Sequence, residues 1–199
     1  MAIARSLALS TAIAALASLS CSKPEPVKAG RPTLTAGGVT WRILNGNWKK
    51  QGDSLVGSGG HIQSATELTD GTIEMDIEEQ GGAPSTVGVG FRYMLFNDDP
   101  SRASGYTLNL SGNAFNVFRG ANNYWLSVNP DTKGLIPSSI IDPKKNHVII
   151  RLKGPSFEID VNGASLINLS DSAYTHGHVN LWVESAGQSV LFSNIQVKG

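Results

Sequence analysis

The stretch Thr72-Ile73-Glu74-Met75-Asp76-Ile77-Glu78 alternates strictly between apolar and acidic side chains after its first residue. Successive side chains of a β-strand point to opposite faces of a sheet, whereas an amphipathic helix repeats its apolar positions every three or four residues. The spacing therefore predicts a half-buried strand whose apolar side chains enter the core. The acidic side chains then lie on the opposite face: Glu74, Asp76 and Glu78.

The same period of two recurs in residues 86–94. One face of this second predicted strand is apolar and is formed by Val87, Val89, Phe91 and Tyr93. The other face is formed by Gly88, Gly90 and Arg92. Two glycines beside one arginine leave open space on that second face.

Short alternating or apolar segments continue to the end of the chain, separated by turn residues. Asn162-Gly163 is the clearest turn, because both central residues of a type I′ hairpin turn need a positive φ. Further strands are predicted at residues 106–111, 114–119, 147–153, 157–161, 179–184 and 190–197. No helical stripe occurs in the sequence from Val39 onward. About ten or more short strands with tight turns predict one all-β domain, built as a sandwich or a closed barrel.

The first twenty residues are predicted to be a secretory signal peptide. Arg5 is their only charged residue, and residues 7–19 are almost entirely apolar or small. This run is shorter than the ~20 apolar residues that a membrane-spanning helix needs, and no later segment approaches that length. We therefore expect an exported protein, located in the periplasm or at the cell surface.

Cys21, the only cysteine, directly follows the apolar run and precedes a polar segment. The arrangement resembles a bacterial lipoprotein signal, in which the cysteine becomes the acylated first residue. Ser18 stands where such signals usually carry leucine, and cleavage after Ala17 or Ser20 without lipidation is the alternative. A single cysteine cannot form an internal disulfide. We expect a lipid anchor to the membrane at Cys21.

The mature chain is predicted to contain a tether and one domain. Residues 21–38 are the flexible tether, because prolines interrupt a segment without apolar periodicity, and residues 39–199 are the sandwich domain. Removal of residues 1–20 leaves 15 lysines and arginines (16 minus 1) against 16 aspartates and glutamates. This near-neutral balance argues against a nucleic-acid partner.

Several short motifs follow one another along residues 40–199 in a characteristic order. They include Gly71-Thr72-Ile73-Glu74-Met75, Gly105-Tyr106-Thr107-Leu108, Val161-Asn162-Gly163, Gly177-His178-Val179 and Phe192-Ser193-Asn194-Ile195. This order resembles the concanavalin A-like lectin and glucanase superfamily, which implies a two-sheet antiparallel jelly-roll sandwich. That superfamily contains lectins, carbohydrate-binding modules, glycoside hydrolases, lyases and laminin G-like adhesion domains, so the fold alone does not name a function.

Within the superfamily, the chain is most similar to bacterial domains associated with the hydrolysis of 3-keto-disaccharides. Gly88, Arg92 and Gly105-Tyr106 match two motifs of those domains, and Val89 is a close substitute in one of them. Thr107 stands where those domains carry glutamate. The resemblance implies glycoside hydrolysis, from which the threonine is a departure.

The acidic face of residues 72–78 supplies the candidate catalytic residues. Glu74, Asp76 and Glu78 resemble the nucleophile, helper and acid/base signature of family-sixteen glycoside hydrolases. Retaining hydrolysis needs two carboxyl groups about 5–5.5 Å apart. On a regular strand the Cα atoms of Glu74 and Glu78 are about 13 Å apart, so the two side chains must lean together or a bulge must shorten the distance between them. A solvent-exposed face of an amphipathic strand is the alternative.

Four residues on predicted outward faces are candidates for ligand binding: Arg92, Asn109, Trp182 and Glu184. Arg92 can donate a fork of hydrogen bonds to sugar hydroxyls or a carboxylate, and an ion pair with Glu74 or Asp76 is its structural alternative. An outward Trp182 offers a flat apolar surface for a sugar ring, unless it packs under a loop. Tyr124 and Trp125 lie at a predicted turn, where they rim a groove or plug the end of the sandwich.

No metal site is expected from the sequence. The histidines are scattered and lack the spacing of zinc ligands: His61, His147, His176 and His178. Asn97-Asp98-Asp99 is rich in oxygen atoms that suit calcium, but Asp-Asp before Pro100 is also an ordinary turn signal. We expect no organic cofactor either.

Together these features predict an exported cell-envelope domain that binds an oligo- or polysaccharide on a concave sheet face. The candidate residues are expected to meet on that face: Glu74, Asp76, Arg92, Asn109, Trp182 and Glu184. One alternative is a hydrolase of the 3-keto-disaccharide type, with Glu74 or Asp76 as acid/base and Arg92 orienting the substrate. The other is a non-catalytic laminin G-like adhesion or structural module.

Overall fold

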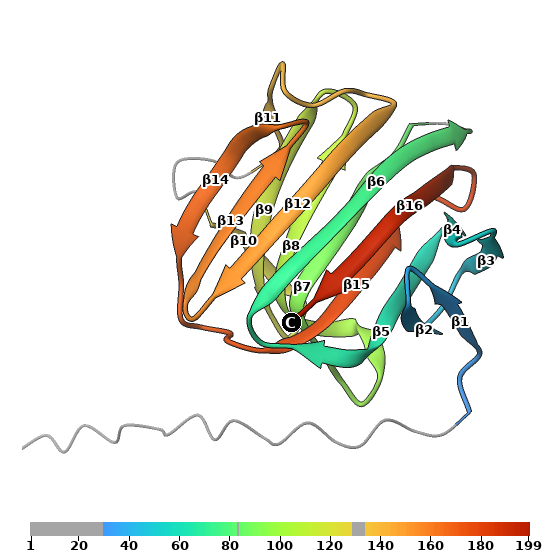
Figure 1. The fold of residues 1–199 in the computed structure, drawn as a ribbon, viewed down its shortest axis with the longest axis horizontal. Coiled ribbons are helices and arrows are strands. Elements are labelled where there is room, and N and C mark those ends of the chain that lie inside the picture. The colour runs from blue at the N-terminus through green and yellow to red at the C-terminus, as the bar shows by residue number, and fades with distance from the viewer. Residues whose placement is uncertain (1–29, 83, 129–133) are drawn as a thin grey trace, which may run out of the picture.

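Two antiparallel β-sheets pack against each other in the computed structural model, which describes residues 30–82, 84–128 and 134–199 (Figure 1). The nine-stranded sheet contains, in spatial order, β1 (Thr33–Ala36), β2 (Val39–Ile43), β5 (Gly60–Leu68), β15 (Gly177–Val183), β7 (Val87–Phe96), β8 (Asp99–Ser111), β9 (Ala114–Ala121) and β10 (Tyr124–Ser127), with β11 (Ile136–Pro137) paired to β9. The seven-stranded sheet contains β14 (Ala164–Ser170), β13 (Ser156–Val161), β12 (Lys145–Lys153), β6 (Gly71–Gly81), β16 (Ser189–Lys198), β4 (Ser54–Ser58) and β3 (Asn47–Gln51). The predicted all-β, two-sheet antiparallel sandwich is confirmed.

Every regular element in these ranges is a strand. No helix in the described part of the chain is therefore long and apolar enough to cross a membrane.

The core lies between the two sheets and confirms the alternation that predicts the fold. β6 is the central strand of the seven-stranded sheet, which faces the viewer in Figure 1. Its apolar side chains Ile73, Met75 and Ile77 are 1%, 0% and 3% exposed. Its acidic side chains consequently lie on the outer face of the same sheet.

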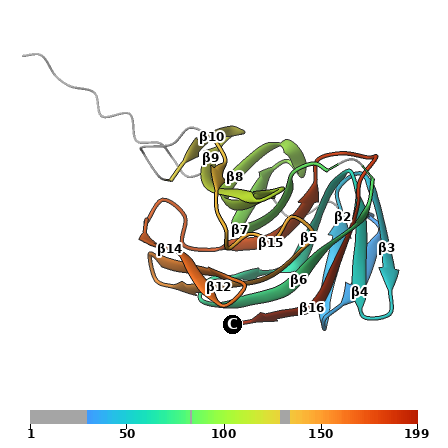
Figure 2. The ribbon, with the colours of Figure 1, turned by 90° about the horizontal axis from the view of Figure 1, so that it is seen from above.

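The nine-stranded sheet is strongly curved. In the view of Figure 2, β8, β9 and β10 rise above β7 and β15. Sheets of many strands twist and curl because each strand has a right-handed twist. The curvature can therefore form a depression on the outer face of this sheet.

Two tight turns follow the expected chemistry. Asn162 and Gly163 have φ values of 53° and 79° between β13 and β14, so the predicted hairpin with positive φ at both central residues is confirmed. Asn97 and Asp98, with φ values of 56° and 57°, turn the chain in the same way between β7 and β8. The oxygen-rich segment is thus a hairpin turn, followed by Asp99, whose carboxylate accepts hydrogen bonds from Ser101.

The sandwich begins earlier than predicted. Strand β1, within the predicted tether of residues 21–38, pairs antiparallel with β2, and its register runs from Thr33 opposite Arg42 to Ala36 opposite Val39. Ala36 is fully buried in the core. The boundary at residue 38 is wrong because β1 is short and flanked by proline and glycine, which hides its apolar alternation. The predicted signal peptide and the lipidation site Cys21 lie outside the described residues.

A bulge in β7 overturns the predicted orientation of Arg92. The register between β7 and β8 shifts between Phe91 and Met94, and Arg92 has a φ of 48°. One extra residue in a strand reverses the faces of all residues that follow it. Tyr93 therefore replaces Arg92 on the outer face, which the uninterrupted period of two does not predict.

Arg92 instead holds one end of the sandwich together. Its guanidinium donates hydrogen bonds to the carbonyl oxygens of Gly154 at 2.5 Å and Tyr174 at 3.2 Å, and lies 3.5 Å from that of Thr69. Its nearest carboxylate is Asp70, at 3.8 Å, and its side chain is fully buried. The ion pair with Glu74 or Asp76, which was the structural alternative for Arg92, does not form either, because the bulge turns the arginine away from the outer face.

Candidate functional site

The candidate site residues lie on two opposite sides of the molecule. Glu74, Asp76 and Glu78 are on the outer face of the seven-stranded sheet, because their apolar neighbours fill the core from β6. Asn109 and Trp182 are on the outer face of the nine-stranded sheet, in β8 and β15. The expected meeting of the carboxylates with Trp182 on one face is wrong. β6 pairs with β12 and β16 and belongs to the other sheet.

A hollow of about 330 Å³ opens on the outer face of the nine-stranded sheet. Its lining residues come from β5, β7, β8, β9, β10 and β15 and from the loop before β10: His61, Tyr93, Pro100, Thr107, Asn109, Phe118, Asn123, Trp125 and Trp182. A volume of about 300–1,000 Å³ with apolar walls and a few polar groups is typical of small-molecule sites. We call this set of nine residues the aromatic hollow.

Trp182 lies flat on the sheet because the neighbouring strand carries glycine. Gly88 is the register partner of Trp182, and a Cβ atom at Gly88 would be 1.8 Å from the indole Nε1. Trp125 lies over Gly120 in the same way, with a Cβ there only 2.5 Å from its ring. The open space predicted beside Gly88 and Gly90 is therefore occupied by the rings of Trp182 and Tyr93, which line the hollow.

Hydrogen bonds fix these rings in place. The Trp182 indole donates to the hydroxyl of Thr107 at 3.2 Å, and that hydroxyl donates to the Asn109 side-chain oxygen at 2.9 Å. The Trp125 indole donates to the side-chain oxygen of Asn123 at 3.0 Å. Tyr93 stacks on Trp125 with ring centroids 6.0 Å apart. A rigid aromatic floor costs little entropy when a ligand ring stacks on it.

The aromatic hollow carries no net charge near neutral pH. Its nine lining residues include no carboxylate, lysine or arginine. Burial lowers the pKa of His61 below its usual value, against the opposing effect of the hydrogen bond with Asn180. Burial also raises the pKa of Tyr93. Both side chains are therefore neutral at pH 7.

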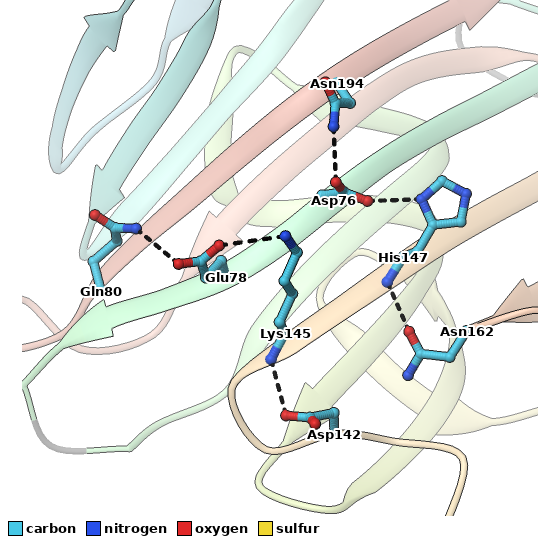
Figure 3. Close-up of polar contacts among 8 residues, drawn as sticks. All are labelled: Asp76, Glu78, Gln80, Asp142, Lys145, His147, Asn162 and Asn194. Carbon is cyan, nitrogen blue, oxygen red and sulfur yellow. Dashed lines mark hydrogen bonds and ion pairs between the residues drawn. The ribbon is translucent and has the colours of Figure 1, made fainter.

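The opposite face of the molecule carries a polar cluster around Asp76 (Figure 3). The Nδ1 atom of His147 is 2.7 Å from one oxygen of Asp76, and Asn194 donates to the other oxygen at 2.8 Å. Nε2 of His147 is 3.4 Å from Glu74. These residues border a second hollow of about 460 Å³, which we call the carboxylate hollow: Asp53, Ser54, Glu74, Asp76, His147, Asn194, Ile195 and Gln196.

Glu74 and Glu78 do not form the close pair that retaining hydrolysis requires. Glu78 interacts with Lys145 at 3.7 Å and with Gln80 at 3.3 Å, whereas Glu74 faces His147. The register of β6 against β12 is continuous from Gly71 to Glu78, so no bulge shortens the path of about 13 Å between the two Cα atoms. The geometry leaves Asp76 as the most strongly oriented carboxylate of the three.

Asp76 is expected to make stability depend on acid pH. Burial alone would raise its pKa, but hydrogen bonds from His147 and Asn194 outweigh that effect and lower the pKa. A carboxyl group with a lowered folded-state pKa stabilises the fold above its unfolded pKa of about 4 and loses that contribution as the pH falls through the folded value. In urea unfolding at stepped pH, wild type should therefore lose more stability below about pH 4 than Asp76→Asn. Parallel pH curves for the two proteins would contradict this assignment.

Two other predicted ligand-binding residues lie outside the aromatic hollow. Glu184 directly follows β15, and its carboxylate accepts a hydrogen bond from the backbone of Thr86 at 3.1 Å. Arg92 is enclosed at the end of the sandwich, as described above. Tyr124 is 71% exposed, whereas its neighbour Trp125 lines the hollow. Of the two roles that the sequence allows for this pair, Trp125 therefore lines a groove. The described residues contain no group of three or more potential metal ligands.

Only solved structures resemble this chain, and they describe its fold. No protein-family model and no curated protein matches the chain. Among solved structures, the carbohydrate-binding module CBM66 from Bacillus subtilis has 22% identity and a TM-score of 0.65, covering 84% of this chain and 100% of the module. The β-glucanase of Bacillus licheniformis has 10% identity and a TM-score of 0.55, covering 86% of this chain and 100% of the glucanase.

The fold is a concanavalin A-like jelly roll. A Bacillus subtilis protein of unknown function with a galectin-like fold also superposes, with 14% identity, a TM-score of 0.52, and coverage of 79% of this chain and 88% of that protein. The resemblance that the motif order predicts is therefore confirmed for the concanavalin A-like architecture. At these identities the comparison describes architecture, and function has to be argued from the two hollows.

Proposed function

We propose that this concanavalin A-like domain binds a glycan in the aromatic hollow of its nine-stranded sheet. The observation that carries the proposal is the Trp182 ring, which lies flat over Gly88 among side chains that can hydrogen-bond hydroxyl groups. A sugar ring has an apolar face of C–H groups and an edge of hydroxyls, so it complements an aromatic floor with polar neighbours. The carbohydrate-binding module among the structural neighbours supports the same ligand class.

A binding screen tests this proposal. The full chain is run in native gels that contain soluble polysaccharides, and retardation is compared with gels without polysaccharide. We expect at least one neutral polysaccharide to retard the protein. A glycan array and a gel series in which nothing binds would overturn the proposal and would favour the laminin G-like structural role.

The glycine below Trp182 offers a variant that alters the platform without removing an aromatic ring. Gly88→Ala places a Cβ atom 1.8 Å from the indole, so the ring must tilt off the sheet. We expect glycan affinity to fall at least about tenfold, or about 1.4 kcal/mol. Gly134→Ala is the matched control, because its added Cβ meets no heavy atom within 4 Å. Equal affinities of the two variants would show that the position of the ring does not matter.

Hydrolysis at the carboxylate hollow is a second candidate function. The observation that favours it is the orientation of Asp76 by His147 and Asn194, with Glu74 beside His147. A carboxylate held by a histidine can take part in general acid/base chemistry. Sugar release from a 3-keto-disaccharide that disappears in both Glu74→Gln and Asp76→Asn would support this role, and release that persists in both would exclude it.

The N-terminal residues bear on where the domain resides. We infer from the first twenty residues and from Cys21 that the protein is a lipoprotein of the cell envelope, located in the periplasm or on the cell surface. The glycan would then be an extracellular or envelope polysaccharide. Metabolic labelling with a palmitate analogue should mark the wild-type chain and not Cys21→Ala. Labelling of neither chain would contradict a lipid anchor.

A further inference from the structure

The proton on His61 is placed by its neighbour Asn180. The side-chain nitrogen of Asn180 donates to the carbonyl oxygen of Ile62 at 3.1 Å. Its side-chain oxygen is then the atom that faces Nδ1 of His61, at 3.2 Å. An amide oxygen only accepts hydrogen bonds, so Nδ1 carries the hydrogen. In the neutral imidazole, Nε2 is consequently a hydrogen-bond acceptor at the wall of the aromatic hollow.

Two asparagines supply donors on the other side of the hollow. The side-chain oxygen of Asn109 accepts from Thr107, and that of Asn123 accepts from Trp125. Each amide therefore has its oxygen engaged and its Nδ2 group left to donate, and no described residue accepts from either Nδ2. The hollow thus combines one histidine acceptor with two amide donors, and none of them is charged.

The charged side chains near the hollow are directed elsewhere. Arg119, next to Phe118 in β9, makes an ion pair with Asp171 at 2.8 Å. Arg102 in β8 stacks on the ring of Phe96, 4.0 Å from its centroid. A carboxylate or sulfate that entered the hollow would lose hydration without gaining an opposite charge, which is costly. A hydroxyl group can both donate and accept, so it can satisfy either kind of partner.

We propose that the aromatic hollow selects an uncharged sugar ring, with one sugar hydroxyl donating to Nε2 of His61 and others accepting from Asn109 and Asn123. This inference rests on the proposed glycan binding and adds the ligand class and a specificity-determining residue. His61 also stacks beside Trp182, with ring centroids 6.0 Å apart, so it positions a hydroxyl at the edge of the ring that stacks on the indole. Acidic and sulfated polysaccharides are excluded by the lack of a cation.

Matched pairs of polysaccharides test the ligand class. The full chain is titrated with hydroxyethyl cellulose and carboxymethyl cellulose, with dextran and dextran sulfate, and with galactan and polygalacturonate. We expect the neutral member of a bound pair to bind at least about tenfold more tightly. Equal or tighter binding of the charged member would overturn neutral selection while leaving glycan binding in place. Binding of no member of any pair would overturn both.

A pH series tests the role of His61. The His61 ring contacts Asn180 and Trp182 from β15, and neither of them titrates. On the neighbouring strand β2, the charged Arg42 is the register partner of Gln63, and its guanidinium donates to the carbonyl oxygen of Ala65. Among the other residues that line the hollow, only Tyr93 can ionise, and its raised pKa keeps it protonated from pH 5 to 8. Because burial lowers the pKa of His61, affinity should stay constant from about pH 8 to 6.5 and fall below that range, where Nε2 gains a proton and stops accepting.

Two glutamine variants separate this role from a structural one. In His61→Gln, the side chain does not titrate, so the fall in affinity at acid pH should disappear. In His147→Gln, on the opposite face, the wild-type pH profile should remain. An acid fall that persists in His61→Gln would overturn the assignment of His61, and so would a fall that disappears in His147→Gln.

Discussion

Replacement of Trp182 by alanine is expected to remove glycan binding almost completely. The indole is the floor of the aromatic hollow, it is held by Thr107, and the glycine beneath it gives no other surface for stacking. The loss of a central aromatic anchor costs about 2 kcal/mol or more, which corresponds to an affinity about 30-fold lower. Isothermal titration with the best neutral polysaccharide from the screen measures this change directly.

Two further variants make the Trp182 result specific. Trp182→Phe keeps a flat apolar ring and should retain most of the affinity, although it loses the hydrogen bond to Thr107. Asp76→Asn changes the opposite face and should bind like wild type. Circular dichroism shows whether each variant is folded. A folded Trp182→Ala variant with wild-type affinity would contradict the proposed site.

Replacement of Arg92 by alanine is expected to have the largest effect on stability. The buried guanidinium donates to carbonyl oxygens of Gly154 and Tyr174, and both would lose their donor. Hydrogen bonds to charged groups contribute about 1.5–3 kcal/mol each, so we expect the free energy of unfolding to fall by about 3 kcal/mol or more. Urea unfolding followed by circular dichroism measures the change.

Arg151 provides the matched control for Arg92. It pairs with Asp160 and Glu158 on the surface, and its side chain is 44% exposed. Exposed ion pairs contribute less than about 1 kcal/mol, so Arg151→Ala should unfold close to wild type. The folded Arg92→Ala protein should still bind glycan. A variant that unfolds like wild type but loses glycan binding would return Arg92 to the ligand site that the sequence predicts.

Much of the fold is predictable from local alternation. In β6, the apolar residues Ile73 and Met75 are buried as the period of two requires, and in β8 Leu108 and Leu110 enter the core while Asn109 lines the hollow. These strands are regular over the segments concerned, so each side chain's face follows from its position in the sequence. The turn at Asn162 and Gly163 follows from their tolerance of positive φ.

The composition of the site was less predictable, for two physical reasons. A single left-handed residue, Arg92, reverses the faces of the residues after it, so Tyr93 enters the hollow. The pairing of Gly88 with Trp182 joins β7 to β15, which are far apart in the chain, and local patterns do not encode such a pairing. For the same reason the sequence predicts no role for His61, although this histidine directly follows the glycine pair at positions 59 and 60.

The four tryptophans allow the most direct test of glycan binding in the aromatic hollow. Trp182 and Trp125 line the hollow, whereas Trp41 and Trp48 are core residues with exposures of 0% and 8%. In ¹⁵N-correlated NMR spectra, titration with the bound polysaccharide should shift the indole signals of Trp182 and Trp125 and leave those of Trp41 and Trp48 in place. Unchanged Trp182 and Trp125 signals at saturation, with shifts of the His147 ring instead, would place the glycan on the carboxylate hollow and contradict the account.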